Sequence, residues 1–444
     1  MQLRFSFTVV AIRAARVLGA VIVPGATWTD TSGNDIQAHG GGFLKVGSTF
    51  YWFGEDKSHN SALFKAVSCY SSSDLVSWTR QNDALTPIPG TNISTSNIVE
   101  RPKVKTNQYV MWFHSDSSNY GAAQVGVAAA SSPCGPYTYR SSFKPLGADS
   151  RDMGLFQDAA QSVYLLYASD NNQNFKISRL DSGYLNVQSQ VSVLSGSTLE
   201  SPGIIKRNDV YYLFASHTTG WDPNPNKFFT ASSLSGPWSS QADIAPAATR
   251  TYFSQNTYDM LLSSNTAIYM GDRWRPSLLG SSRYIWYPMT WGSGFPQILA
   301  ADVWSINLSA GTFTAASGTT YEAESGTLSG AAQVLSDGSF SGGRAVGWLG
   351  NGGSLTINNV QGTGRDQWVS LYYANGDSTW RNTTVSVNGG STVLVDQPNT
   401  GGGHVILSVP VKLNLRSGSN SITFSVNQNS YAGDLDKIIV YTAA

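Results

Sequence analysis

Residues 197–216 read STLESPGIIKRNDVYYLFAS, a stretch in which the carboxylate of Glu200 stands directly ahead of an apolar run. The run has the alternation of a β-strand, and it is followed by a polar turn and by a second strand rich in aromatic residues. The same order of a polar or acidic opening, a strand, a turn and an aromatic strand occurs elsewhere in the chain. Residues 197–216 are therefore one unit of a repeat.

Five such units lie between residues 35 and 300. They contain the strings GGFLKVGSTFYWFGEDKS, ERPKVKTNQYVMWFHSDS, RDMGLFQDAAQSVYLLYASD, ESPGIIKRNDVYYLFASH and YDMLLSSNTAIYMGDR. The openings at Glu100, Asp152 and Glu200 are about 50 residues apart, the length of a four-stranded propeller blade with generous loops. Almost no stretch has the apolar stripe of a helix. We therefore predict an all-β protein in which residues 21–308 form a five-bladed β-propeller.

The composition limits the range of partners. The chain has 444 residues, 28 Lys and Arg against 28 Asp and Glu, and only 13% charged residues. A neutral chain without a basic stripe is unsuited to a nucleic-acid backbone, and no internal segment has the roughly 20 apolar residues needed to span a membrane. We expect no nucleic-acid or membrane partner and a monomer that binds polar, uncharged molecules.

The first 20 residues, MQLRFSFTVVAIRAARVLGA, resemble a secretory signal with cleavage after Ala20, although two arginines interrupt the apolar segment. The sequence therefore predicts a secreted, extracellular protein. In a eukaryotic secretory pathway Asn92, Asn307 and Asn382 would be glycosylation acceptors. Cys69 and Cys134 are the two cysteines; they are too few for a disulfide framework, but they could pair in an oxidising compartment.

The acids that open the repeats have a structural and a functional interpretation. A single carboxylate at such a place is usually a turn residue satisfied by local hydrogen bonds. Glu100, Asp152 and Glu200 occupy equivalent places, however, and the innermost strands of a propeller bring equivalent places together at one end of its channel. Mutual repulsion raises the pKa of at least one such acid, so that it can donate a proton near neutral pH. Paired acids of this kind perform glycoside hydrolysis.

The strings RDMGLFQDAAQSVYLLYAS and LESPGIIKRNDVYYLFAS resemble the third-blade and fourth-blade motifs of glycoside hydrolase family 43. The resemblance extends over all five repeats, about residues 22–308. It implies that Glu200 is the general acid and that Asp152 adjusts the pKa of that acid and orients it.

The chain departs from the usual family pattern in the first repeat, where Gln37, Ala38 and His39 stand near the expected Asp base. This departure resembles the branch of inverting enzymes that act on β-1,3-galactan. Another group must then position the attacking water; the candidate is Gln255 at the opening of the fifth repeat, and the alternative is Glu100. A purely structural role for Gln255 also remains open. The predicted substrate-binding residues are Glu100, Glu55 and Tyr120.

A second domain follows a stretch of small residues, SAGTFTAASGT at 309–319, which has the composition of a linker. Residues 320–444 contain short alternating strands and predict a β-sandwich of the jelly-roll type. Their two ends resemble carbohydrate-binding module family 35, which implies a structural calcium held by Glu322, Glu324 and Asp436. The alternative is that these acids lie on a solvated face. No cofactor is expected for catalysis.

Sugar binding in such modules uses loops at one end of the sandwich, where aromatic faces stack on a pyranose and polar groups bind its hydroxyls. The predicted binding residues are Tyr431, Asp434, Trp348, Asn375 and Leu335.

The sequence leaves two classes of function open. The first is an exo-acting hydrolase that removes galactose from β-1,3-galactan, the backbone of arabinogalactan, with an appended module that holds the polymer. The second is a carbohydrate-binding protein that has lost catalysis together with the usual base. Within the first class, an arabinofuranosidase or xylosidase is the alternative. The presence of both Glu200 and Asp152 favours an enzyme.

Overall fold

The computed structural model describes residues 20–105, 109–292 and 294–442. Apart from its last residue, the predicted signal segment 1–20 lies outside the described residues. In the described ranges no helix has the length and hydropathy of a membrane span.

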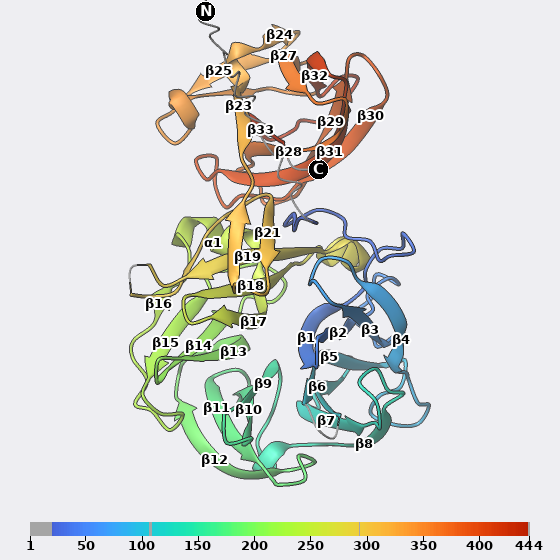
Figure 1. Ribbon diagram of the computed structural model, residues 1–444, viewed down its shortest axis with the longest axis vertical. Helices are drawn as coiled ribbons and strands as arrows, with labels where there is room; N and C mark the ends of the chain where they lie inside the picture. The colour runs from blue at the N-terminus through green and yellow to red at the C-terminus, as the bar shows by residue number, and fades with distance from the viewer. Residues whose placement is uncertain (1–19, 106–108, 293, 443–444) are drawn as a thin grey trace, which may run out of the picture.

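Residues 39–298 form five antiparallel sheets of four strands each (Figure 1). The first two sheets consist of β1 (His39–Val46), β2 (Thr49–Glu55), β3 (Val67–Ser72) and β4 (Thr79–Leu85), then β5 (Asn97–Lys105), β6 (Val110–Ser117), β7 (Gln124–Ala129) and β8 (Thr138–Phe143). The third consists of β9 (Met153–Gln157), β10 (Val163–Ser169), β11 (Asn174–Leu180) and β12 (Val187–Leu194). The last two consist of β13 (Leu199–Arg207), β14 (Val210–His217), β15 (Lys227–Ala231) and β16 (Ala242–Asp243), then β17 (Gln255–Ser263), β18 (Thr266–Arg273), β19 (Arg283–Thr290) and β20 (Gln297–Ile298).

Helical segments in the described chain are short. The four-residue α1 (Arg250–Phe253) precedes the fifth sheet, and the 3₁₀ turns are η1 (Pro145–Gly147), η2 (Ala247–Thr249), η3 (Pro276–Ser281), η4 (Ala323–Ser325) and η5 (Ser341–Gly343). The architecture is all-β, as the sequence predicted.

The five sheets are arranged around a common axis (Figure 1). Their first strands β1, β5, β9, β13 and β17 contact one another in that order, and β17 returns to β1. A separate apolar cluster fills the space between each pair of neighbouring sheets, and one of these clusters, with Trp52 and Trp286, joins the first sheet to the last. This arrangement agrees with the predicted five-bladed propeller.

The inner strands of the second and fourth sheets carry the same bulge. The pairing register shifts between Glu100 and Lys103 in β5 and between Glu200 and Gly203 in β13. The residue after each glutamate has a positive φ, 56° at Arg101 and 55° at Ser201. Because a bulge interrupts the alternation of side chains, a glutamate and its neighbour can both face the same end of the channel.

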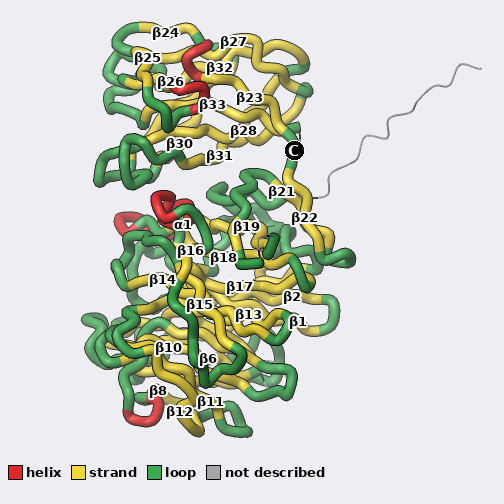
Figure 2. Tube along the Cα trace, turned by 90° about the vertical axis from the view of Figure 1, so that its left-hand side faces the viewer, coloured by secondary structure: helices red, strands yellow, loops and turns green. Residues whose placement is uncertain are grey.

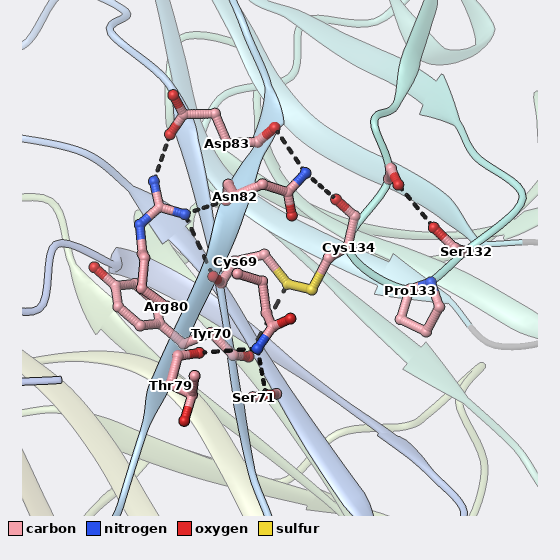
Figure 3. The surroundings of a disulfide bond; sticks show 12 residues. Cys69, Tyr70, Ser71, Thr79, Arg80, Asn82, Asp83, Ser132, Pro133 and Cys134 are labelled. Carbon is pink, nitrogen blue, oxygen red and sulfur yellow. Dashed lines mark hydrogen bonds and ion pairs between the residues drawn. A yellow bond between two sulfur atoms is a disulfide. The ribbon is translucent and has the colours of Figure 1, made fainter. Parts of the chain in front are cut away.

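A disulfide joins the first two sheets (Figure 3). Cys69 lies on β3, and Cys134 lies in the connection between β7 and β8. The amide of Asn82 on β4 donates a hydrogen bond to the carbonyl of Cys134 at 3.0 Å. The two cysteines are therefore paired in the structure, a point that the sequence had left open. The bond closes a loop across two blades, a constraint worth about 4 kcal/mol for this separation of 65 residues in the chain-entropy model.

The C-terminal part contains two antiparallel sheets (Figure 1). One sheet has six strands: β23 (Gly318–Glu322), β25 (Gln333–Ser336), β26 (Arg344–Gly347), β28 (Arg365–Ala374), β31 (Leu407–Leu415) and β33 (Asp434–Tyr441). The other has five: β24 (Thr327–Ser329), β27 (Ser354–Gly362), β29 (Arg381–Val387), β30 (Thr392–Gln397) and β32 (Gly418–Phe424). Side chains from both sheets form one apolar cluster, as expected for two packed layers.

The predicted linker, residues 309–319, is more ordered than its composition suggested. It contains β22 (Thr312–Ala315), which pairs with β21 (Trp304–Asn307), and it ends in the first residues of β23. Small residues signal a linker by composition alone, but the alternation in GTFTA also suits a strand. This segment is therefore a structured connection.

The C-terminal part also packs against the propeller, with α1, β21 and β22 at the junction (Figure 2). The buried carboxylate of Asp302 accepts hydrogen bonds from the hydroxyls of Tyr372 at 2.7 Å, Ser408 at 2.7 Å and Tyr441 at 3.1 Å. Arg275 forms an ion pair with Asp396 at 2.6 Å. The two parts therefore share a polar interface instead of being joined by the chain alone.

Candidate active site

A pocket of about 200 Å³ lies where the inner strands begin. All six residues predicted for catalysis and for substrate binding in the propeller line it, namely Glu55, Glu100, Tyr120, Asp152, Glu200 and Gln255. The propeller therefore brings these residues together from all five blades. Their contacts differ from one carboxylate to the next.

Glu200 is buried, and Gln255 holds it in place. The Nε2 of Gln255 donates to Glu200 Oε1 at 2.8 Å and to Ser216 Oγ at 3.2 Å. Burial raises the pKa of Glu200 well above its ordinary value, and the negative charge of Asp152 raises it further, while Arg101 opposes both. Glu200 can therefore remain protonated near neutral pH, as a general acid must.

Asp152 is held by the bulges of both neighbouring blades. Arg101 Nη2 lies 3.0 Å from Asp152 Oδ2, and Ser201 Oγ donates to the same oxygen at 2.9 Å. Because arginine keeps its charge at every relevant pH, Asp152 is paired with a permanent positive charge. Asp152 is thus held in a fixed position beside Glu200.

Glu100 lies in the opposite electrostatic setting. Tyr120 donates to its Oε1 at 2.9 Å, and His114 Nδ1 lies 3.3 Å from its Oε2. Lys57 Nζ is 3.9 Å away. Burial works to raise the pKa of Glu100, but the hydrogen bond from His114 and the charge of Lys57 outweigh it and lower the pKa to about 2. Glu100 is therefore a firmly ionised carboxylate and a weak base.

Glu55 connects the first blade to this network. Its Oε2 lies 2.8 Å from Lys57 Nζ, and its Oε1 accepts from the backbone N–H of Arg101 at 2.9 Å. Burial raises the pKa of Glu55, and the charge of Lys57 opposes that rise.

His39, at the place where the usual family pattern has an acid, is buried and does not line the pocket. Its Nδ1 bonds Asp272 at 3.0 Å. The first blade therefore contributes the end of its second strand to the pocket, through Glu55, instead of an inner-strand acid.

Among the described residues, Glu100, His114 and Asp152 bring ligand atoms within 4.8 Å of one another, as a metal site would. Their donor set does not fit a metal. Both nitrogens of His114 face carboxylates, Glu100 at 3.3 Å and Asp116 at 2.8 Å. Burial lowers the pKa of His114, but these two hydrogen bonds outweigh it and raise the pKa to about 9. A doubly protonated imidazole has no lone pair to offer.

Comparisons with known proteins identify the family of this chain. The family model of glycosyl hydrolases family 43 matches residues 31–260. The chain belongs to this family. An exo-β-1,3-galactanase from Phanerochaete chrysosporium, solved with β-1,3-galactotriose, is 71% identical, with 95% of this chain and 100% of that chain covered and a TM-score of 0.93. The same enzyme has also been solved with galactose.

A more distant relative is an exo-β-1,3-galactanase from Clostridium thermocellum, 30% identical, with 87% of this chain and 88% of that chain covered and a TM-score of 0.63. A search of curated proteins found no match. Membership of the family makes the chain a glycoside hydrolase.

Several charged and aromatic residues that line this family 43 pocket were not singled out from the sequence: Arg101, His114, Arg151, Trp221 and Trp274. Lys57, which pairs with Glu55, was not singled out either. Arg101 and Lys57 follow predicted glutamates within two residues, in the strings ERPK and GEDK, and a basic residue so close to a predicted acid was the available signal. His114 and the tryptophans carry no comparable local signal.

The C-terminal part brings most of its predicted sugar-binding residues together. The rings of Trp348 and Tyr431 meet edge to face with centroids 5.8 Å apart, and both side chains are exposed. Gly347 lies against Leu335 and Asp434, since a side chain there would collide with both.

Asn375 is different, because it is buried. Its amide donates to the carbonyls of Thr379 and Gln397 at 3.0 and 3.1 Å, and its Oδ1 accepts from the N–H of Asp377 at 3.1 Å. The side chain of Asn375 therefore supports its own loop.

Two of the three predicted calcium ligands share a hydrogen-bond partner, but the three do not form one of the groups of described residues whose ligand atoms all lie within 4.8 Å of one another. Ser341 bridges Glu322 and Asp436 with hydrogen bonds of 2.9 and 2.6 Å. One carboxylate oxygen each of Glu322 and Glu324 is buried without a hydrogen-bond partner. Unpartnered carboxylate oxygens are suitable donors for a hard cation such as Ca²⁺.

Proposed function

We propose that this glycoside hydrolase is an inverting, exo-acting enzyme that releases galactose from β-1,3-galactan. The observation that carries the chemistry is the setting of Glu200, a buried carboxyl group held by Gln255 beside a second carboxylate. The substrate is supported by the similarity to the Phanerochaete exo-β-1,3-galactanase over 95% of the chain.

In this mechanism Glu200 donates its proton to the glycosidic oxygen as the bond breaks. Gln255 donates to Oε1 of Glu200, so that the acid proton is carried on Oε2. Asp152 favours the protonated state of Glu200 until the leaving group accepts the proton. General acid catalysis of this kind contributes about 10²–10⁴-fold to the rate.

The sugar in the pocket is oriented by Glu100, Glu55 and Tyr120. An ionised carboxylate such as Glu100 accepts hydrogen bonds from sugar hydroxyls, and such bonds contribute about 1.5–3 kcal/mol each. The low pKa of Glu100 makes it a poor base. We therefore assign the positioning of the attacking water to Gln255, the other candidate.

The C-terminal domain, in this proposal, is a β-sandwich carbohydrate-binding module similar to family 35. The exposed Trp348 and Tyr431 form its sugar platform, with Asp434 and Leu335 beside them. Glu322, Glu324 and Asp436 would hold a calcium ion, which adds positive charge among three carboxylates and ties the two ends of the domain together. Chelation should then lower the melting temperature and leave the hydrolysis of a soluble disaccharide unchanged.

The function is tested by incubating the purified chain separately with β-1,3-galactan, arabinan and xylan and analysing the sugars released. Galactose from galactan, with the α-anomer first in proton NMR, supports an inverting exo-galactanase. Arabinose or xylose would support the alternative activities of the family. Binding to galactan without any sugar release would support the non-catalytic alternative. Export is tested by locating the protein in cells that express the full sequence with residues 1–20.

A further inference from the structure

The side-chain amide of Gln255 lies at the centre of the pocket, and its orientation decides what Glu200 can do. An amide can be turned by half a rotation, which exchanges its oxygen, an acceptor, with its NH₂ group, a donor of two hydrogens. In the structure the NH₂ group faces Glu200. Some other group must keep the oxygen on the opposite side.

Arg101 and Trp274 supply that constraint. Arg101 Nη2 donates to Gln255 Oε1 at 2.6 Å, and Trp274 Nε1 donates to the same oxygen at 2.9 Å. Guanidinium and indole groups are donors only, so a reversed amide would place two donors against its own NH₂ hydrogens. All three side chains are buried, so water cannot relieve such a clash.

The guanidinium of Arg101 is itself fixed at three points. In addition to Gln255, it donates through Nη1 to the carbonyl of Asn256 at 2.9 Å and lies 3.0 Å from Asp152. The bulge in β5, with its positive φ at Arg101, directs this side chain into the pocket beside Glu100. A planar fork that reaches three acceptors is specific to arginine, since lysine offers a single point charge on a shorter stem.

We propose that Arg101 is a positioning residue that locks the amide of Gln255 with its NH₂ group toward Glu200, and so keeps the proton of the acid free for the substrate. This inference rests on the proposed role of Glu200. With the amide reversed, Glu200 would donate its proton to Oε1 of Gln255, and that proton would be held inside the protein. Arg101 therefore contributes to acid catalysis without touching the leaving group.

The test compares Arg101→Lys with a matched surface control, Arg140→Lys, because Arg140 is exposed on β8. Rates are measured on two substrates. The leaving group of β-1,3-galactobiose is a sugar, which needs a proton to depart, whereas the leaving group of 2,4-dinitrophenyl β-galactoside needs little help from an acid. We expect kcat of Arg101→Lys on the disaccharide to fall about 10²-fold, the lower end of the contribution of an acid. The fall on the aryl galactoside should be less than about fivefold, KM should change little, and the control should match the wild type.

An equal loss on both substrates, or no loss on either, would overturn the proposal. If Arg101→Lys unfolds in thermal melting, Trp274→Phe replaces it, since this change removes the second donor to Oε1 but keeps an aromatic ring; it should show a smaller loss with the same dependence on the leaving group. Wild-type protein that releases no galactose from galactan would instead refute the proposed function, so the two failures are distinguishable.

Discussion

Glu100 and Glu200 occupy the same place in two blades, yet their chemistry is opposite. Each begins a Glu-X-Pro sequence, each sits in a bulge of an inner strand, and each is followed by a residue with positive φ. Glu100 is surrounded by donors and has a pKa of about 2. Glu200 is buried beside Asp152, and its pKa is raised. The surrounding side chains, not the local motif, therefore decide which glutamate can act as the acid.

The difference arises from the partner that each glutamate meets. His114 and Lys57 bring positive charge to Glu100 from its own sheet and from the first sheet. Glu200 meets the negative charge of Asp152, and Arg101 and Ser201 hold that side chain in place beside it. Substitutions around Glu100 and around Glu200 should therefore change the activity by different amounts.

The largest effect is expected for Glu200→Gln. An amide cannot donate a proton to the leaving oxygen, so the rate on galactan should fall about 10²–10⁴-fold while galactose still binds. The measurement is kcat on β-1,3-galactan together with calorimetric binding of galactose. A variant that kept more than about a tenth of the wild-type rate would refute the assignment of the acid.

Glu100→Gln should lower the activity less than Glu200→Gln, and it should also affect substrate binding. Loss of a charged acceptor for sugar hydroxyls should lower kcat/KM about 10–100-fold, partly through a higher KM. Steady-state kinetics on the disaccharide measures both constants. If azide restored the activity of this variant and produced a galactosyl azide of inverted configuration, Glu100 would be the base and Gln255 would lose that role.

Asp152→Asn should shift the pH dependence. Removing the negative charge lowers the pKa of Glu200, so the acid loses its proton at a lower pH and the alkaline limb of kcat/KM moves down. Activity at neutral pH should fall about tenfold, part of the total contribution of the acid. Asp209→Asn, at an exposed site, is the matched control. An unchanged alkaline limb would mean that Asp152 does not adjust the pKa of the acid.

The smallest effect on rate, but a measurable one on stability, is expected for His114→Asn. The pKa of His114 rises from 6.5 to about 9 on folding. Its charge therefore stabilises the fold by about 3 kcal/mol below pH 6.5, and this contribution is lost as the pH rises through about 9. Thermal melting at pH 6 and pH 9.5 should show a large difference between variant and wild type at the lower pH only. His59→Asn, on the surface, should show no such difference.

Repeats with a fixed spacing made the propeller and its acids predictable. Glu100, Asp152 and Glu200 were found because equivalent positions of repeated units converge on one axis. The contacts of Lys57 and His114 with Glu100 could not be predicted in the same way, because Lys57 follows the second strand of the first blade and His114 lies on the second strand of the second blade. The strand in segment 309–319 could not be predicted, because composition does not reveal that β22 finds a partner in β21.

By itself, the sequence determined the strand periodicity, the five repeats, the family motifs around Asp152 and Glu200, and the acidic strings at the two ends of the C-terminal domain. These features are local, or recur at a regular interval, so they can be read along the chain. Only the tertiary structure decided that the amide of Gln255 turns its NH₂ group to Glu200, that Arg101 holds it there, and that Glu100 and Glu200 differ in pKa. A pKa depends on burial and on charges within a few ångströms, and in this fold those charges are contributed by residues that are distant in the sequence, such as Lys57 for Glu100 and Asp152 and Arg101 for Glu200.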